Sequence, residues 1–425
     1  MRILIREVKD RIDSEVEISG WVQNIRIMSS VLFIELRDVS GTVQGVLLKK
    51  GNEDLFNDLK NLPRESVMSI TGQAVKSQAK IGYEVQIRHL EVLNRADAPL
   101  PLGVVDKIES DIETRLENRF LDLRRPETLS IFKVQSTIAN SIRDYFVKNG
   151  FIEIHSPKIV AAATEGGTEL FPVKYFERSA YLSQSPQLYK EIMMAAGFDK
   201  VFEVAPAFRA EEHNTPRHLN EFTSIDMEMS FVNDDDVMDV LESVIKVAGK
   251  SIADSNEREL EILGVGKPSL NYKFKRITYS DYVKMANEKG IELKDGEDLS
   301  TPVFKAVGGG INEFYFITRW PRGLKPFYVQ SFDEKYSRGF DLQFGELEIT
   351  SGAQRVHSPD VLLNNLRSKG LDPVSFSFYV NAFKYGMPPH AGWAIGLERL
   401  TMVLLNISNI RETTLFPRDR TRVTP

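Results

Sequence analysis

The chain has 425 residues and contains no cysteine. Disulfide bonds, thiolate metal sites and cysteine nucleophiles are therefore excluded, and the composition fits a reducing, cytoplasmic environment. Only six histidines are present and none forms a His-x-x-x-His pair, so we expect no zinc. Any metal should be a hard, carboxylate-bound ion such as Mg²⁺.

Long apolar runs are also missing. No stretch approaches the roughly 18 residues that a membrane span needs, and the amino-terminal sequence MRILIREVKD is too charged for a secretory signal. We therefore expect a soluble protein that uses no membrane. The net charge of −6 argues against a protein that coats nucleic acid through bulk charge, although it leaves room for a local basic path.

The chain divides into regions of different pattern. Residues 1–94 contain about five short runs of alternating apolar and polar residues separated by turn-like spacers, which is typical of a small β-barrel. The proline-rich stretch 96–103 ends this region. We assign 1–103 to a first domain, the charged segment 104–127 to a hinge and 128–425 to a second domain.

The second domain should open with a helix followed by a strand. Apolar residues recur at helical spacing from Ile131 to Tyr145, and Gly150 is a suitable helix end. The strand that follows is interrupted by Pro157. Strands and helices beyond it do not alternate regularly, so we predict an α+β domain on an antiparallel sheet flanked by helices.

Residues 201–231 form the most informative stretch, with two strand-like runs around an eleven-residue polar loop, Glu211 to Glu221. The second run alternates, which places Phe222, Ser224, Asp226 and Glu228 on one face and Thr223, Ile225, Met227 and Met229 on the other. The loop carries Arg217 and His218. Cations and acids on one hairpin face predict a floor that holds a polyanion and an amine together.

Three motifs in order resemble class II aminoacyl-tRNA synthetases of the aspartate, asparagine and lysine subgroup. Motif 1 corresponds to 131–160, motif 2 to FRAEEHNTPRHLNEF at 208–222 and motif 3 to GLERL at 396–400. The resemblance covers essentially the whole chain and is strongest to aspartate enzymes of archaeal and eukaryotic type. It implies an OB-fold anticodon-binding barrel before a class II catalytic domain, with 235–330 inserted between motifs 2 and 3.

The resemblance implies an ATP-dependent, AMP-forming ligase. The carboxylate of L-aspartate attacks the α-phosphate of ATP, which forms aspartyl-adenylate and releases pyrophosphate. The 3′ end of tRNA-Asp then takes the acyl group and AMP leaves. Whether tRNA-Asn is also charged stays open. Motif 1 builds a dimer interface in this class, so we expect a homodimer, and we expect Mg²⁺ with ATP but no organic cofactor.

Other interpretations stay open beside this one. The chain could be an asparaginyl or lysyl relative, a non-catalytic RNA-binding paralogue, or a free-standing amide-forming synthetase on the same fold. A non-catalytic paralogue should have lost Arg209, Glu348 or Arg399, and all three are present. An amide-forming enzyme would not need residues 1–94.

By resemblance, the catalytic residues are Arg209, Arg399 and Glu348. The planar fork of Arg209 suits the α-phosphate and the attacking carboxylate together, while Phe222 would stack on adenine. The expected ATP contacts are Arg209, Ala210, Glu211, Arg217, His218, Leu219, Phe222, Glu348, Gly396, Leu397, Glu398 and Arg399.

The resemblance also implies a Mg²⁺ site at Glu348 and Ser351, with Asp341 as a helper in the outer shell. One carboxylate and one hydroxyl cannot fill an octahedron, so phosphates and water would complete it. Gly392 and Gly396 would let backbone and nucleotide approach closely.

The amino-acid pocket is expected to hold two cations, Lys190 in SQSPQLYKE and Arg355 in SGAQR. Asparagine in this pocket would leave buried cations uncompensated, which costs on the order of several kcal/mol. Asparagine enzymes of the subgroup typically lack the lysine. By resemblance, Asp226, Gln187 and Thr164 hold the α-ammonium, and Gly166 and Gly167 make the loop around Glu165 mobile. The expected aspartate contacts are Glu165, Gln187, Lys190, Arg209, Asp226, Ser351 and Arg355.

The barrel should bind the anticodon by stacking and by hydrogen bonds to base edges. Phe33 lies on the polar face of its strand, where an aromatic residue fits a stacking platform. Gln44 could bind a base edge and Arg26 a phosphate. In archaeal relatives two positions, here Gln23 and Lys80, bear on the choice of tRNA. Gln23 fits neither known pattern and Lys80 favours strict use of tRNA-Asp.

Overall fold

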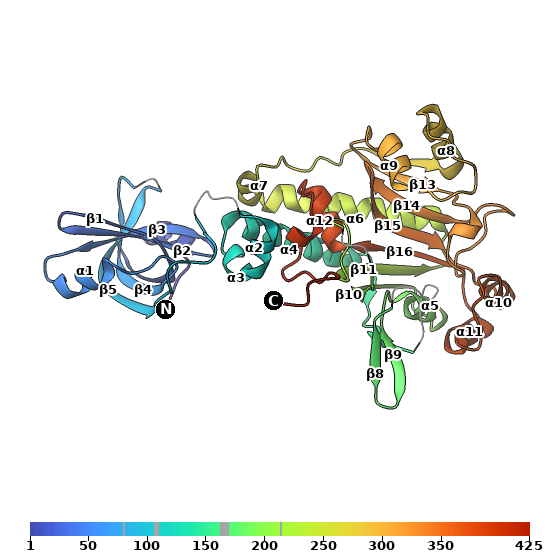
Figure 1. The fold of residues 1–425 in the computed structure, drawn as a ribbon, viewed down its shortest axis with the longest axis horizontal. Helices are drawn as coiled ribbons and strands as arrows, with labels where there is room; N and C mark the ends of the chain where they lie inside the picture. Colours follow the sequence, from blue (N-terminus) through green and yellow to red (C-terminus); the bar gives the residue numbers. More distant parts are fainter. Residues whose placement is uncertain (80, 106–109, 162–169, 213–214) are drawn as a thin grey trace. The chain divides into compact units, whose positions relative to one another are not determined.

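The computed structural model describes residues 1–79, 81–105, 110–161, 170–212 and 215–425. Contacts divide the chain into two compact units, Met1–Asp111 and Ile112–Pro425 (Figure 1). Each unit has its own apolar core. In these described ranges, we find no helix with both the length and the apolar character that a membrane crossing requires.

Unit 1 is a closed five-stranded barrel in which the strands follow the order β1-β2-β3-β5-β4. Alternate residues point inward because successive side chains of a strand face opposite sides, and in β1 this buries Val16, Ile18 and Val22. The barrel predicted for residues 1–94 is confirmed. Its elements are η1 (Ile5–Arg11), β1 (Glu15–Met28), β2 (Val31–Asp38), β3 (Gly41–Leu48), α1 (Glu53–Leu59), β4 (Val67–Lys76) and β5 (Tyr83–Asn94).

Unit 2 is built on an eight-stranded sheet with the order β12-β13-β14-β15-β16-β11-β10-β6. Its six central strands are antiparallel, as predicted, whereas the edge strands β12 and β6 pair in parallel. The strands are β6 (Ile152–Glu153), β10 (Lys200–Phe208), β11 (Glu221–Ser230), β12 (Lys275–Thr278), β13 (Phe314–Thr318), β14 (Gly339–Phe344), β15 (Leu347–Gln354) and β16 (His390–Gly396).

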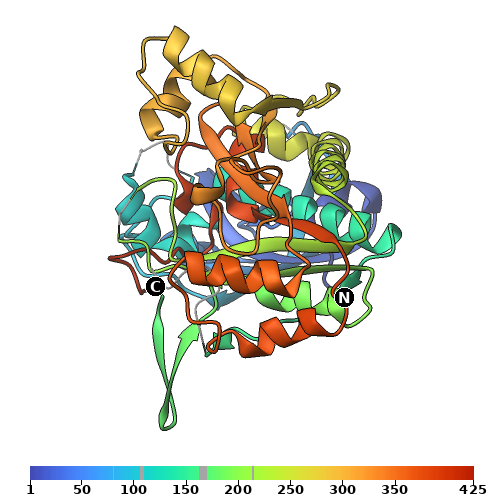
Figure 2. The same ribbon diagram turned by 90° about the vertical axis from the view of Figure 1, so that its right-hand side faces the viewer.

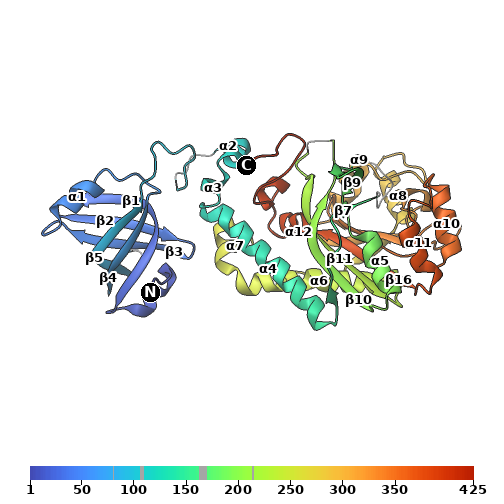
Figure 3. The same ribbon diagram turned by 90° about the horizontal axis from the view of Figure 1, so that it is seen from below.

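Two long helices, α4 (Pro126–Lys148) and α6 (Asp234–Ser255), lie side by side against one face of this sheet (Figure 3). They share one apolar core with the sheet, whose members include Ile138, Ile142, Leu241, Ile245 and Trp393. The odd-numbered residues of β11, from Ile225 to Met229, face this core. The even-numbered residues, from Ser224 to Glu228, therefore face the opposite side, where the candidate site lies.

Shorter helices complete unit 2. α5 (Gln187–Ala195), α10 (Pro359–Ser368) and α11 (Ser377–Lys384) form a second apolar core beside the sheet (Figure 2). A separate sheet, β7-β9-β8, carries the hairpin that projects from unit 2. The remaining elements are α2 (Ile112–Glu117), α3 (Arg119–Asp122), β7 (Ile159–Val160), β8 (Pro172–Tyr175), β9 (Arg178–Leu182), α7 (Glu257–Leu263), α8 (Tyr279–Glu288), α9 (Thr301–Gly308), η2 (Arg322–Leu324), α12 (Leu397–Leu404) and η3 (Ile410–Thr413).

The segment 104–127 differs from the predicted hinge, because α2 and α3 belong to unit 2. Arg119 is only 1% exposed, pairs with Asp122, and donates to the backbone carbonyls of Thr414 and Leu415 at 2.7 and 2.9 Å. Charges that suggest a solvated linker in the sequence are thus paired inside the fold. The division between the units lies after Asp111.

Residues 235–330, which lie between motifs 2 and 3, belong to unit 2. They supply α6 to the central core and β12 and β13 to the sheet. At the end of α9, a Cβ on Gly308 would lie 2.1 Å from the carbonyl oxygen of Gly345. This glycine therefore permits a close approach between two backbones.

Candidate active site

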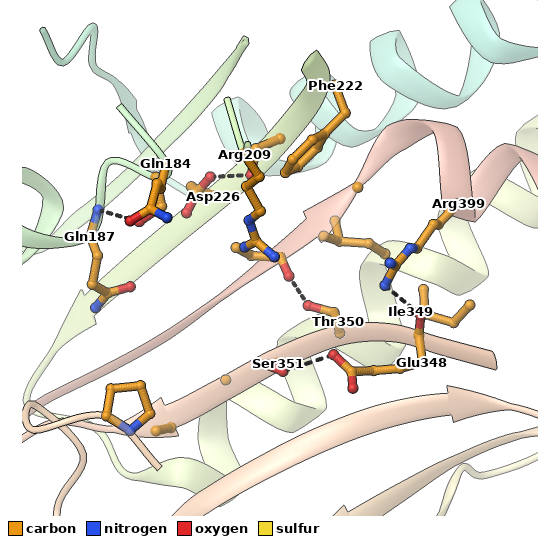
Figure 4. Close-up of a pocket in the computed structure, with 18 of the residues that line it drawn as sticks. Gln184, Gln187, Arg209, Phe222, Asp226, Glu348, Ile349, Thr350, Ser351 and Arg399 are labelled. Carbon is orange, nitrogen blue, oxygen red and sulfur yellow. Dashed lines mark hydrogen bonds between the residues drawn. The ribbon is translucent and has the colours of Figure 1, made fainter. Parts of the chain in front are cut away.

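A cavity of about 310 Å³ lies on the face of the central sheet opposite α4 and α6 (Figure 4). Its floor consists of β11, β15 and β16, whose register brings polar residues together. Asp226 of β11 and Ser351 of β15 both pair with Ala394 of β16, so the three residues lie in one row across the sheet. The small side chain of Ala394 leaves space between the two polar ones.

Arg209 stands at the end of β10, facing Phe222 across the hairpin. Its guanidinium carbon lies 5.4 Å from the centre of the Phe222 ring. The Nε of Arg209 is buried and has no hydrogen-bond partner in the part of the chain that the structure describes. A buried guanidinium nitrogen without an acceptor, on the wall of a cavity, indicates a place for an anionic ligand.

Three more basic side chains gather near Arg209. Arg399, near the start of α12, donates to the carbonyl oxygens of Glu348 at 3.1 Å and Arg217 at 3.3 Å. Arg217 pairs with Glu346, and the Nδ1 of His218 lies 2.6 Å from the Oγ1 of Thr215. Burial lowers the pKa of Arg399, and burial followed by repulsion from Arg399 lowers the pKa of His218. This end of the cavity therefore favours a polyanion such as a triphosphate.

Glu348 and Ser351 lie together on β15, with a hydrogen bond of 3.2 Å from the Ser351 hydroxyl to Glu348 Oε1. Burial, and then repulsion from Asp341, raise the pKa of the Glu348 carboxyl. Asp341 is held by Lys325, whose Nζ lies 2.8 and 2.9 Å from its two oxygens.

Neighbouring carboxylates and a hydroxyl fit a hard divalent cation such as Mg²⁺. Within the described ranges, however, no three His, Cys, Asp or Glu side chains gather as a metal cluster. The remaining coordinating oxygens would have to come from nucleotide and water.

The two cations predicted for the amino-acid pocket share one buried carboxylate, Glu228. Lys190 Nζ lies 3.0 Å from Asp226 Oδ1 and 3.6 Å from Glu228 Oε2. Arg355 donates to both oxygens of Glu228, at 3.0 and 3.3 Å. Burial alone would lower the pKa of Arg355, but the carboxylates of Glu228 and Glu191 outweigh it and raise the pKa.

This pairing corrects the expectation that an amide ligand would leave two buried cations uncompensated. Both cations already have carboxylate partners before any substrate binds. Moreover, Arg355 lines the cavity, whereas Lys190 lies beneath Asp226 and does not. Arg355 is therefore the cation placed to contact a ligand directly.

Most of the predicted substrate contacts line the cavity: Gln187, Arg209, Glu211, Arg217, His218, Leu219, Phe222, Asp226, Glu348, Ser351, Arg355, Gly396, Glu398 and Arg399. Ala210, Leu397 and Lys190 do not line it. Thr164, Glu165, Gly166 and Gly167 lie outside the described residues, as does Lys80. Gly392 also differs from expectation, because a Cβ there would lie 2.1 Å from Glu228 Oε2. It makes room for a carboxylate, not for nucleotide.

Three residues near the cavity were not predicted from the sequence to have a role in the site. Glu228 shares the polar face of β11 with Asp226, and that alternation was the available signal. Lys325 lines the cavity and holds Asp341, and Glu191 lies behind Gln187 on α5. Neither has a sequence signal, since each depends on partners far along the chain.

The predicted anticodon residues meet on one side of the barrel. The Arg26 guanidinium carbon lies 5.8 Å from the centre of the Phe33 ring, and Arg26 Nη2 donates to Gln44 Oε1 at 3.2 Å. Gln44 in turn donates to Glu84 at 3.0 Å. Gln23 lies where the register of β1 against β2 shifts, which marks a bulge. Three strands thus place an aromatic ring, a cation and an amide side by side.

A central antiparallel sheet with an arginine-lined cavity, on a chain that begins with a five-stranded barrel, defines a class II tRNA synthetase. Residues 111–420 match the family described as tRNA synthetases class II (D, K and N), and residues 16–93 match the OB-fold nucleic acid binding domain. The chain belongs to the class II tRNA synthetases of this D, K and N group.

Individual relatives are similar over nearly their whole length. The chain is 56% identical over 420 residues to the aspartate–tRNA(Asp) ligase of Picrophilus torridus, covering 98% of this chain and 99% of the relative. It is 50% identical over 425 residues to the aspartate–tRNA(Asp/Asn) ligase of Methanocaldococcus jannaschii, covering 99% and 97%. A solved asparaginyl-tRNA synthetase from Pyrococcus horikoshii, complexed with asparaginyl-adenylate, is 31% identical with a TM-score of 0.95, covering 100% of both chains.

Glu398 at the start of α12 connects the helix to the hairpin. Its two carboxylate oxygens accept the backbone N–H of Thr223 at 3.0 and 3.1 Å. Burial raises the pKa of Glu398 to about 7 in spite of these hydrogen bonds. The folded protein thus binds a proton more tightly than the unfolded chain does.

Glu398→Gln should therefore change how stability depends on pH. Between about pH 4.5 and 7 the folded wild type retains a proton that the unfolded chain has lost, so wild-type stability falls as pH rises through this window. Across this pH window, the free energy of unfolding of the wild type should fall by up to about 3 kcal/mol more than that of the variant. Urea denaturation at several pH values measures this. Glu127→Gln, at an exposed site on α4, is the matched control, and parallel wild-type and Glu398→Gln profiles would contradict the prediction.

Proposed function

We propose that this enzyme activates L-aspartate with ATP and transfers it to tRNA-Asp. The observation that carries the proposal is the position of Arg209. Its Nε has no acceptor among the described residues and lies in a cavity with an arginine-rich end and a separate end at Arg355. A guanidinium can contact the α-phosphate of ATP and the attacking carboxylate of the amino acid at the same time. The cavity therefore suits the joining of an amino acid to a nucleotide.

Adenylate formation needs positioning and charge stabilisation rather than covalent participation of the protein. Arg209 aligns the two reacting groups, and Arg399 and Arg217 hold the distal phosphates. Phe222 offers its ring to adenine. Mg²⁺, held by Glu348 and Ser351, would supply further neutralisation of the phosphate charge. The presence of all these groups in one cavity argues against a non-catalytic paralogue.

Aspartate is favoured over asparagine by the direct contact that Arg355 offers. The guanidinium presents only donors, so it matches a carboxylate, whereas the NH₂ group of an asparagine side chain would face it donor to donor. Glu228 holds Arg355 in a fixed orientation from below. Lys190 acts indirectly, because it fixes Asp226 and contributes positive charge behind it. The asparaginyl enzyme stays the alternative.

ATP–pyrophosphate exchange with aspartate and asparagine side by side tests this choice. We expect exchange with aspartate and little with asparagine. Arg355→Lys should keep the buried charge but lose the planar fork, which lowers kcat/KM for aspartate about tenfold to a hundredfold and changes the KM for ATP little.

Arg26→Lys, the same substitution on the barrel, is the matched control for this assay, which requires no tRNA. Arg355→Lys is preferable to Lys190→Leu, because removing a cation buried between two acids would also destabilise the fold. Exchange driven by asparagine and not by aspartate would overturn the proposal.

The barrel is proposed to bind the anticodon through Phe33, Arg26 and Gln44. Phe33→Ala should lower kcat/KM for tRNA-Asp by roughly tenfold to a hundredfold, since stacking on one aromatic side chain contributes about 1–3 kcal/mol. Amino-acid activation without tRNA should be unaffected. Leu93→Ala, which trims an exposed apolar residue of β5, is the control. An equal loss in both assays would argue for damage to the fold.

Whether tRNA-Asn is also charged is decided by the same charging assay with both tRNAs. Lys80 favours strict use of tRNA-Asp, whereas Gln23 fits neither pattern, so the use of tRNA-Asn stays open. Charging of tRNA-Asp alone would establish strict use, and comparable charging of tRNA-Asn would establish use of both.

We propose that the protein forms a homodimer. We also propose that it acts in the cytoplasm, where tRNA is charged for protein synthesis. The motif 1 region exposes three large apolar residues, Val147, Ile152 and Ile159, which a second copy would cover. Light scattering at micromolar concentration should give twice the mass of the 48.3 kDa chain. A monomeric mass would contradict the proposal.

A further inference from the structure

A fully buried carboxylate, Glu191, lies behind the amino-acid end of the cavity. It stands one helical turn after Gln187 on α5, so the two side chains share a face of the helix. Glu191 Oε1 accepts a hydrogen bond of 2.6 Å from Gln187 Nε2. Its Oε2 accepts from the Tyr379 hydroxyl at 2.6 Å and lies 3.1 Å from His390 Nε2.

Glu191 is an acceptor at every contact. Burial alone would raise its pKa, but the hydrogen bond and charge of His390, together with Arg355 and Tyr379, lower it. The ionised carboxylate therefore persists without any exposure to solvent. Because it has no proton to donate, each partner must present a donor to it.

This requirement fixes the orientation of the Gln187 amide. A glutamine side chain can normally rotate to exchange its oxygen and nitrogen, and then presents either to a ligand. Here the nitrogen is held by Glu191, so the oxygen is the group left for the cavity. Figure 4 shows the Gln187 oxygen on the side of the other labelled residues and the nitrogen turned away.

We propose that Glu191 is a positioning residue that makes the site selective for an α-ammonium group. By locking Gln187 it sets an acceptor oxygen beside the acceptor Asp226, and a pair of acceptors suits an ammonium, which has only donors. The inference rests on the proposed function, because it takes Gln187 and Asp226 as the ammonium contacts of the substrate.

The same carboxylate supports the opposite end of the substrate. The Nε2 of His390 lies 3.1 Å from Glu191, and the backbone carbonyl of His390 accepts the backbone N–H of Arg355 at 2.8 Å. Glu191 thus connects the residue that binds the ammonium with the residue that binds the side-chain carboxylate. Only the ammonium end, however, depends on the direction of an amide.

Glu191→Gln tests the proposal, with L-aspartate compared with L-malate, in which a hydroxyl replaces the ammonium. A glutamine at 191 can donate to Gln187 and so permits its amide to turn. Aspartate binding by calorimetry should weaken about tenfold or more, and malate binding should change little, because a hydroxyl can donate or accept. The KM for aspartate should rise while the KM for ATP stays constant. Glu242→Gln, at a buried glutamate on α6, is the matched control.

Gln187→Met is a second test of the proposal, because it removes the amide itself and leaves the other contacts of Glu191 in place. It should show the same loss of preference for aspartate over malate. Combined with Glu191→Gln, it should add little further loss, because both substitutions act through one amide. Additive losses, unchanged affinities, or parallel weakening of aspartate and malate would each overturn the proposal.

The wild-type measurement separates this inference from the proposed function. If the wild type binds asparagine rather than aspartate, the function fails, yet the role of Glu191 can be tested with asparagine and its 2-hydroxy analogue. If the wild type prefers aspartate and Glu191→Gln keeps that preference over malate, only the inference fails.

Discussion

The amino-acid end of the site depends on one buried carboxylate, Glu228, which is shared by Lys190 and Arg355. Removing a cation from water is unfavourable unless a fixed counter-charge replaces the lost hydration. Glu228 provides that charge for both cations, and the chain gives up a side chain at Gly392 to admit it. The side chains proposed to contact the amino acid, Asp226 and Arg355 among them, are arranged around this carboxylate.

The two ends of the cavity are electrostatically different. At the amino-acid end, acids and bases are matched before substrate binds. At the nucleotide end, Arg209 keeps a buried nitrogen without an acceptor among the described residues, and burial lowers the pKa of Arg399. The first end is therefore prepared for a zwitterion and the second for net negative charge. For the function proposed above, this asymmetry would orient the two substrates before any bond forms.

Local patterns predicted the parts of the structure that local physics controls. Strand alternation gave the barrel and both faces of β11, and with the family motifs it gave Arg209 and Asp226. Local patterns could not predict interactions between residues that are distant in the sequence. In the sequence Arg119 lies in a segment typical of a solvated linker, and only the fold shows its contacts with the carbonyls near residue 415. Glu191 likewise has the pattern of a surface helix residue, but Tyr379 and His390 cover it. Charge in a sequence predicts exposure, and only the fold shows where charge is buried in pairs.

The register of β11 has a consequence for accuracy in translation. Asp226 and Glu228 alternate with Ile225 and Met227, so a slip of one residue would exchange the binding face with the apolar core. Such a molecule would bury two carboxylates in hydrocarbon and would not fold, rather than fold with an altered pocket. Misfolding of this strand therefore removes the enzyme from use before it can attach the wrong amino acid. An error in the register of β11 thus costs the fold itself and leaves no folded enzyme with an altered pocket.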